Sequence, residues 1–136
     1  MGEDGGALGD FGEKLGIAFQ ITDDLIDYIE AKETTGKPSG SDLRERKVTL
    51  PLIHTLGRAT PAARREIVRL FEAAEPADAD VLRVIDIVAD SGGLEYARSC
   101  GERYAARARE ALDSLPANMA RTGLEASITY VMERHS

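Results

Sequence analysis

Residues 7–31 constrain the fold more than any other part of the chain, because apolar side chains recur there at helical spacing around most of the girth. Two neighbouring stripes follow steps of three, four and seven residues. The first stripe is Leu8, Phe11, Leu15, Ala18, Leu25 and Ile29, and the second is Ile17, Ile21 and Tyr28. A helix with so much apolar surface is normally buried on most sides. The sequence therefore predicts a long helix that packs against several others.

The rest of the chain also favours helices, because Ala, Leu, Glu and Arg are frequent and no alternating strand pattern persists. Thr60 is a predicted N-cap, and Pro51 stands in the first turn of a short helix, where proline is tolerated. Residues 32–47 are polar and contain the helix breakers Gly36, Pro38 and Gly40. The predicted helices are 7–31, a short one from about residue 49, 61–74, 77–91, 94–115 and 117–134. Short connections predict an all-α antiparallel helical bundle that forms one domain, residues 1–136.

Charge and cysteine content exclude several classes of function. A net charge of −7 disfavours nucleic acid, because phosphate repels an acidic chain at long range. Cys100 is the only cysteine, so the sequence has no intrachain disulfide and no cysteine-based metal site. No apolar run approaches the roughly 20 residues that cross a bilayer, and the acidic, glycine-rich start does not resemble a signal peptide. We expect a cytoplasmic protein with no nucleic-acid partner and no transmembrane segment.

Three aspartates interrupt the apolar pattern of residues 7–31. At about 100° per residue, Gln20, Asp23, Asp24 and Asp27 share roughly a third of the circumference. Carboxylates one turn apart repel one another unless a cation lies between them. Magnesium favours oxygen ligands and typically takes one or two carboxylates together with substrate phosphates. The stripe therefore indicates a site for Mg2+ and a phosphorylated ligand, although a solvated charged face remains the plainer interpretation.

The polar segment after this helix adds cations. Lys37 follows the C-terminal end of the helix, where an ammonium group can reach a phosphate oxygen. A solvated loop lysine is the alternative interpretation. Asp42 and Glu45 resemble a capping box for a helical turn. His54 and Cys100 are predicted to be packed side chains rather than ligands.

Two linked motifs resemble the polyprenyl synthetases, the trans-isoprenyl diphosphate synthase family. The stretch LGIAFQITDDLIDY at residues 15–28 is similar to the second aspartate-rich motif of that family. The segments GKPSGSDLR at residues 36–44 and KVTLPLI at residues 47–53 resemble those that follow the motif. The ending, ALDSLP at residues 111–116 and YVMER at residues 130–134, also resembles bacterial members. The resemblance implies half of an isoprenoid-synthase-type fold.

The resemblance also implies a prenyltransferase that adds an allylic diphosphate to isopentenyl diphosphate. Magnesium ions held by two facing aspartate motifs would stabilise the departing pyrophosphate. Asp23 would ligate a magnesium ion, and Asp24 and Asp27 would ligate it or orient its waters. Gln20 and Phe19 would lie beside the allylic substrate. Lys37 and Lys47 would contact its diphosphate, and Gln20 and Lys37 are the candidate catalytic residues.

The sequence departs from the family pattern at several places. Asp23-Asp24 is the only Asp-Asp pair, and Arg64-Arg65 follows no acidic cluster, so the family's first motif is absent from these residues. Arg46 stands where many members have glycine. We therefore expect the carboxy-terminal half of a synthase, inactive alone, with a homo-oligomer or a complementary amino-terminal half as partner. A non-catalytic helical interaction subunit that retains a relic of the motif is the competing hypothesis, and a terpene cyclase is a weaker third.

Overall fold

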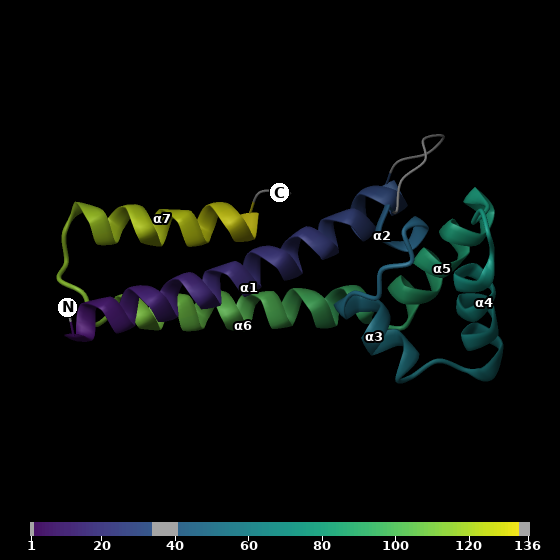
Figure 1. The fold of residues 1–136 in the computed structure, drawn as a ribbon, viewed down its shortest axis with the longest axis horizontal. Coiled ribbons are helices and arrows are strands. Elements are labelled where there is room, and N and C mark those ends of the chain that lie inside the picture. Colours follow the sequence, from purple (N-terminus) through teal and green to yellow (C-terminus); the bar gives the residue numbers. More distant parts are fainter. Residues whose placement is uncertain (1, 34–40, 134–136) are drawn as a thin grey trace. The chain divides into compact units, whose positions relative to one another are not determined.

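The computed structural model describes residues 2–33 and 41–133, and the regular structure within these ranges is helical (Figure 1). The helices are α1 (Gly2–Glu33), α2 (Ser41–Arg44), α3 (Leu50–Leu56), α4 (Pro61–Glu72), α5 (Asp78–Asp90), α6 (Gly93–Leu112) and α7 (Met119–Glu133). The predicted all-α class is confirmed. Among the described residues, no helix combines the length and the apolar character that a membrane span requires.

All six predicted helices are present, and the differences are their end points and one additional short helix, α2. α1 begins at Gly2 rather than at residue 7. The glycines near its start favour the later beginning that the sequence predicted, because glycine lowers helix propensity, but they do not prevent the helix. α2 occupies part of the segment predicted as a loop. The Thr60 cap is confirmed, since its hydroxyl accepts a hydrogen bond from the Ala63 amide at 3.1 Å. Pro51 lies in the first turn of α3, as predicted.

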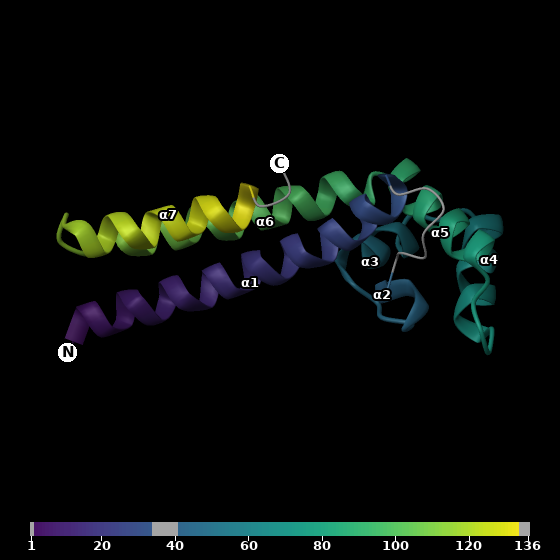
Figure 2. The same ribbon diagram turned by 90° about the horizontal axis from the view of Figure 1, so that it is seen from above.

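The chain divides into two compact units, and α1 and α6 each contribute to both. Unit 1 consists of Met1–Thr22 and Arg98–Ser136, and unit 2 consists of Asp23–Ala97. In unit 1, parts of α1, α6 and α7 pack side by side (Figure 2). The buried side chains of this core are Phe11, Ala18, Ala105, Ala108, Leu112 and Ile128. Three of these six are alanines, which allow the helices to approach closely.

Unit 2 is built around the apolar face of α5, which lies beside α4 (Figure 1). Four α5 side chains are at most 1% exposed: Val81, Val84, Ile85 and Val88. Leu52 of α3 and Ile67 and Leu70 of α4 pack into the same core. Tyr28 from the end of α1 and Leu43 from α2 belong to it as well. This shared core positions the aspartate-bearing end of α1 against the segment that follows it.

The connection between α5 and α6 depends on two glycines. Gly92 has φ +82°, in the left-handed region that glycine adopts without strain. Gly93 lies so close to α3 that a Cβ atom there would be 2.7 Å from the Pro51 carbonyl oxygen and 2.9 Å from the Thr55 hydroxyl. The absence of a side chain at Gly93 therefore lets α6 begin against α3.

Candidate functional site

Asp23, Asp24 and Asp27, the three aspartates of the segment that resembles the second motif, lie on the part of α1 that belongs to unit 2. Asp23 is exposed, whereas Asp24 and Asp27 are half-buried. Leu25 and Tyr28, which alternate with them, are 5% and 1% exposed. Because these apolar side chains anchor the helix, the three carboxylates share the remaining side of it. The predicted common face of the aspartates is therefore compatible with the burial of their neighbours.

Asp27 has a structural role that the sequence did not indicate. Its Oδ1 atom accepts hydrogen bonds from the Ser41 amide at 3.2 Å and the Ser41 hydroxyl at 2.9 Å. Its Oδ2 atom accepts from the Asp42 amide at 3.2 Å. A carboxylate near free amides at the start of a helix is stabilising. Asp27 thus ties the start of α2 to α1, so its carboxylate is already engaged in the fold without a metal ion.

Asp42, which was predicted to form a capping box with Glu45, instead lies near the aspartates of α1. The predicted capping box is wrong, because Asp42 lies inside the first turn of α2 and its own amide is capped by Asp27. Burial and the negative charges of Asp27, Asp24 and Asp23 together raise the pKa of the Asp42 carboxyl to about 6, and the charge of Lys47 partly opposes this rise. Four aspartates therefore share one negative field. In the sequence Asp42 is one aspartate in a segment of glycines and cations. Its spacing from the aspartates of α1 does not predict that their charges act on it.

The cations of the site lie on the segment after α2. Lys47 is exposed, with its Nζ atom 3.0 Å from Glu45 Oε2 and 3.9 Å from Asp42 Oδ1. The hydrogen bond that the Lys47 ammonium group donates to Glu45 raises its pKa, and the charges of Glu45, Asp42 and Asp24 add to this effect. Lys37 lies outside the described residues. Phe19 and Gln20 belong to unit 1 and are exposed, Phe19 by 42%, so core packing within unit 1 does not account for this aromatic residue.

The backbone conformation of Arg46 explains why a glycine would suit the position before Lys47. Its φ of +61° lies in the left-handed region, which costs a residue with a Cβ atom free energy. The guanidinium group donates hydrogen bonds to the carbonyl oxygens of Phe71 at 3.2 Å, Ala74 at 3.0 Å and Ala73. These carbonyls lie at the C-terminal end of α4, where a cation is favourable. Arg46 thus anchors the Lys47 segment to unit 2 despite the strained backbone.

The described residues offer only one side of a metal site. No group of three or more His, Cys, Asp or Glu residues in 2–33 and 41–133 is placed to hold a metal ion by itself. Magnesium commonly takes one or two carboxylates and completes its shell with water and substrate phosphate. The oxygen donors of Asp23 and Asp24, in a field negative enough to raise the pKa of Asp42, suit such a hard cation. The donor set therefore fits magnesium shared with a diphosphate.

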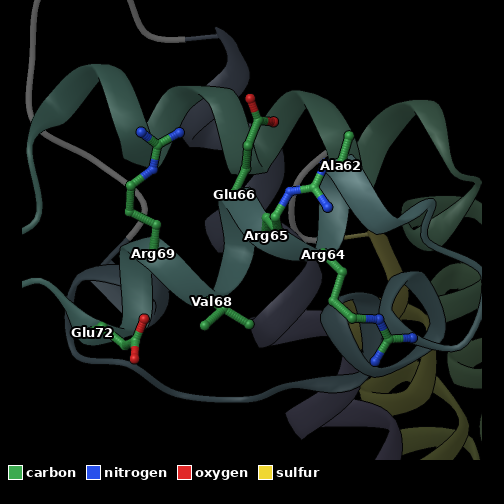
Figure 3. Close-up of a pocket in the computed structure, with 7 residues that line it drawn as sticks. All are labelled: Ala62, Arg64, Arg65, Glu66, Val68, Arg69 and Glu72. Atoms are coloured by element: carbon green, nitrogen blue, oxygen red, sulfur yellow. The ribbon is translucent and has the colours of Figure 1, made fainter.

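A separate hollow in unit 2 lies along α4 and is lined by Ala62, Arg64, Arg65, Glu66, Val68, Arg69 and Glu72 (Figure 3). Its three guanidinium groups point in different directions (Figure 3). The Arg64 guanidinium donates to the Leu56 carbonyl oxygen at 2.8 Å, and Glu66 pairs with Arg83 at 3.0 Å. Because the arginines do not converge and none contacts an aspartate of α1 in the described bonds, the hollow is not the candidate site.

The comparisons with known proteins agree on one family. The sequence profile of the family described as Polyprenyl synthetase matches residues 2–88. The geranylfarnesyl diphosphate synthase of Aeropyrum pernix is 40% identical over 129 residues, which are 93% of this chain and 39% of that enzyme. The crystal structure of a decaprenyl diphosphate synthase from Rhodobacter capsulatus is 35% identical with a TM-score of 0.85, and the match covers 100% of this chain and 41% of that one.

Two of the similar structures were solved in complex with calcium and isoprenyl diphosphate. The polyprenyl synthase of Caulobacter crescentus, complexed with calcium and isoprenyl diphosphate, is 36% identical with a TM-score of 0.85, and the match covers 98% of this chain and 41% of that one. That relative therefore binds a divalent cation together with a prenyl diphosphate. The chain spans about 40% of the length of these three relatives and 27–30% of several longer ones.

Proposed function

Because the chain belongs to the polyprenyl synthetase family, we propose that it serves a prenyltransferase that condenses an allylic diphosphate with isopentenyl diphosphate. The single observation that carries the proposal is the acidic field shared by Asp23, Asp24, Asp27 and Asp42, with the Lys47 ammonium group beside it. A field of this kind favours a divalent cation bound together with a phosphate group. The relative solved with calcium and isoprenyl diphosphate supports this assignment.

In this proposal, Asp23 and Asp24 hold Mg2+ and Lys47 and Lys37 contact the diphosphate. The bound ion supplies Lewis-acid stabilisation of the charge that develops on pyrophosphate as it leaves. Asp27 keeps α2 in place through its three hydrogen bonds, so Lys47 stays near the acids. Gln20 and Phe19 are assigned to the allylic substrate on the resemblance of the motif. The lysines neutralise the diphosphate, and the aspartates orient it through the cation.

The domain we propose is the carboxy-terminal half of the synthase fold, which supplies one metal-and-diphosphate half-site. Its partner would be a segment that carries the facing aspartate motif, in the same or another chain. Exposed apolar side chains on the helices of unit 1 are consistent with such packing. They include Leu8 and Phe19 of α1 and Met119 and Tyr130 of α7, between 42% and 90% exposed.

Thermal unfolding of the chain with Mg2+ and pyrophosphate tests the half-site. The wild-type chain is expected to melt at a higher temperature with both ligands than with either alone, because ligands that bind only the folded state stabilise it. Asp23→Ala removes the exposed metal ligand, so most of this increase should disappear. Asp90→Ala, which removes an exposed acid from α5, is the matched control and should keep the full increase.

The outcome separates the two hypotheses for the chain. A ligand-dependent increase that depends on Asp23 supports a working half-site. If the wild-type chain shows no increase even at millimolar magnesium and pyrophosphate, the half-site is wrong and the non-catalytic interaction subunit is favoured. An increase that Asp90→Ala abolishes as fully as Asp23→Ala would instead indicate a nonspecific effect of the cation on an acidic chain.

A further inference from the structure

The short helix α2 ends in a tight backbone turn that leads directly to Lys47. The Arg46 amide donates a hydrogen bond to the Leu43 carbonyl oxygen at 3.0 Å, and the Lys47 amide donates one to the Asp42 carbonyl oxygen at 2.7 Å. This pair of bonds closes a helix when the residue after its end has a left-handed backbone, as Arg46 has with φ +61°. The turn therefore fixes the backbone of Lys47 to that of Asp42.

The turn also determines where the Lys47 side chain can reach. Its Nζ atom lies 3.9 Å from Asp42 Oδ1 and 3.0 Å from Glu45 Oε2. Asp42 is in turn tied to α1, because its amide donates a hydrogen bond to Asp27 Oδ2 at 3.2 Å. A series of short contacts thus runs from α1 through α2 to the Lys47 ammonium group. Another backbone conformation at position 46 would break this series just before Lys47.

The left-handed conformation of Arg46 needs compensation, because the Cβ atom of an L-residue is crowded there. The side chain of the same residue supplies it. Its guanidinium group donates hydrogen bonds to the carbonyl oxygens of Phe71 at 3.2 Å, Ala74 at 3.0 Å and Ala73. These carbonyl groups lie in and just after the last turn of α4, where a helix leaves such groups unpaired. A planar guanidinium group presents several donors in a fixed geometry, so it can hold these oxygens together.

We propose that Arg46 is a positioning residue for the diphosphate: its guanidinium group stabilises the left-handed turn, and the turn places the Lys47 ammonium group next to Asp42 at the acidic site. Arg46 acts through the backbone of Lys47 rather than by contact with the ligand, because its guanidinium group is bonded to the end of α4. An arginine thereby maintains a turn that glycine would adopt without a side chain. The proposal rests on the function proposed above.

Two substitutions separate the turn from the charge. Arg46→Ala and Arg46→Gly both remove the guanidinium group and its positive charge, but only glycine keeps the left-handed turn without strain. Calorimetric titration with magnesium pyrophosphate should give the glycine variant an affinity close to that of the wild type. The alanine variant should bind about tenfold more weakly, because a Cβ atom disfavours the left-handed conformation by a factor of that order.

Two further measurements distinguish positioning from a purely structural role. The Lys47 amide should exchange its hydrogen at similar rates in the wild type and in Arg46→Gly, and about tenfold faster in Arg46→Ala, because its bond to Asp42 depends on the turn. In a Lys47→Ala background, Arg46→Ala should cause no further loss of affinity, because Arg46 acts through Lys47. A structural role alone would lower the resistance to urea without this dependence on Lys47.

Each outcome supports the positioning role or overturns it. Equal losses of affinity in the alanine and glycine variants would show that the turn is not what Arg46 contributes, and no loss in either would show that the turn does not place the ammonium group. Both results overturn the positioning role and leave the proposed function intact, and a further loss in the Lys47→Ala background also overturns it. If the wild-type chain binds no magnesium pyrophosphate, the proposed function fails, and the positioning role fails with it. If Arg46→Ala does not fold, Arg46→Gln takes its place under the same criteria.

Discussion

At the residue scale, the carboxylates of the candidate site repel one another, and nearby hydrogen-bond donors and cations offset part of this repulsion. Asp27 is neutralised in part by three hydrogen bonds from the start of α2. The pKa of the Asp42 carboxyl is raised, and within the described residues the Lys47 ammonium group approaches that carboxylate only to 3.9 Å. The metal-free chain therefore retains electrostatic strain at Asp42, which a cation bound at Asp23 and Asp24 would relieve.

Asp42 should make the stability of the metal-free chain depend on pH. The pKa of its carboxyl is about 6 in the folded chain and near 3.8 without the fold. Between these values the folded chain binds more protons, so the free energy of unfolding falls as the pH rises, and it stays low above pH 6. Asp42→Asn should raise the melting temperature by about 2–4 °C at pH 7.5 and leave it unchanged at pH 3.5. Glu102→Gln, an exposed acid of α6, should show no such difference, and an equal response of both variants would contradict the assignment.

Arg46 combines a strained backbone with a favourable side chain, and two substitutions separate them. Arg46→Ala and Arg46→Gly both lose the bonds to the end of α4, but only glycine adopts a φ of +61° without cost. Urea unfolding should show the glycine variant more stable than the alanine variant by about 1 kcal/mol. The alanine variant should be less stable than the wild type by about 1 kcal/mol or more. Equal stability of the two variants would show that the backbone at this position carries no strain.

At the element scale, close approach of helices matters more than the strength of any single polar contact. α6 begins against α3 because Gly93 has no side chain, and α1 and α6 contribute the buried alanines Ala18, Ala105 and Ala108 to the core of unit 1. Thr22 in α1 adds a contact from its hydroxyl to the Met132 sulfur of α7 at 3.7 Å. Small residues at these crossings therefore carry much of the specificity of the packing.

Gly93→Ala tests this packing directly. The added methyl group would meet the Pro51 carbonyl oxygen at 2.7 Å, and because that atom belongs to the backbone it cannot move aside easily. The variant should lose about 2 kcal/mol of unfolding free energy in urea. Gly123→Ala in α7, where nothing lies within 4 Å, is the control and should gain about 0.5–1 kcal/mol from helix propensity. A loss at both positions would indicate that helix packing is not the cause.

At the scale of the whole molecule, the acidic site is one-sided. The chain spans between 27% and 43% of the length of the relatives that it matches, and it contains a single Asp-Asp pair. The charge on a departing pyrophosphate would be stabilised from one side only, by the Asp23 and Asp24 half-site. Catalysis of prenyl transfer should then require the facing motif from a second segment.

The pure 136-residue chain should accordingly form no longer prenyl diphosphate from an allylic diphosphate, isopentenyl diphosphate and magnesium. A radiolabelled isopentenyl diphosphate assay measures this directly. Addition of an amino-terminal segment from one of the relatives should restore turnover, and Asp23→Ala in the mixture should remove it again. Clear turnover by the pure chain alone would contradict the one-sided site.

The sequence by itself determined the helices and the register of the aspartates, because both follow from a local repeat of about 3.6 residues. It also indicated the Thr60 cap, the place of Pro51 and the family. Only the tertiary structure decided that Asp27 caps α2 and that Asp42 joins the acidic field. These partners are 14 to 19 positions apart in the chain, on either side of a polar connection. A periodic pattern places side chains on one helix, whereas the meeting of two segments depends on the core that packs them together.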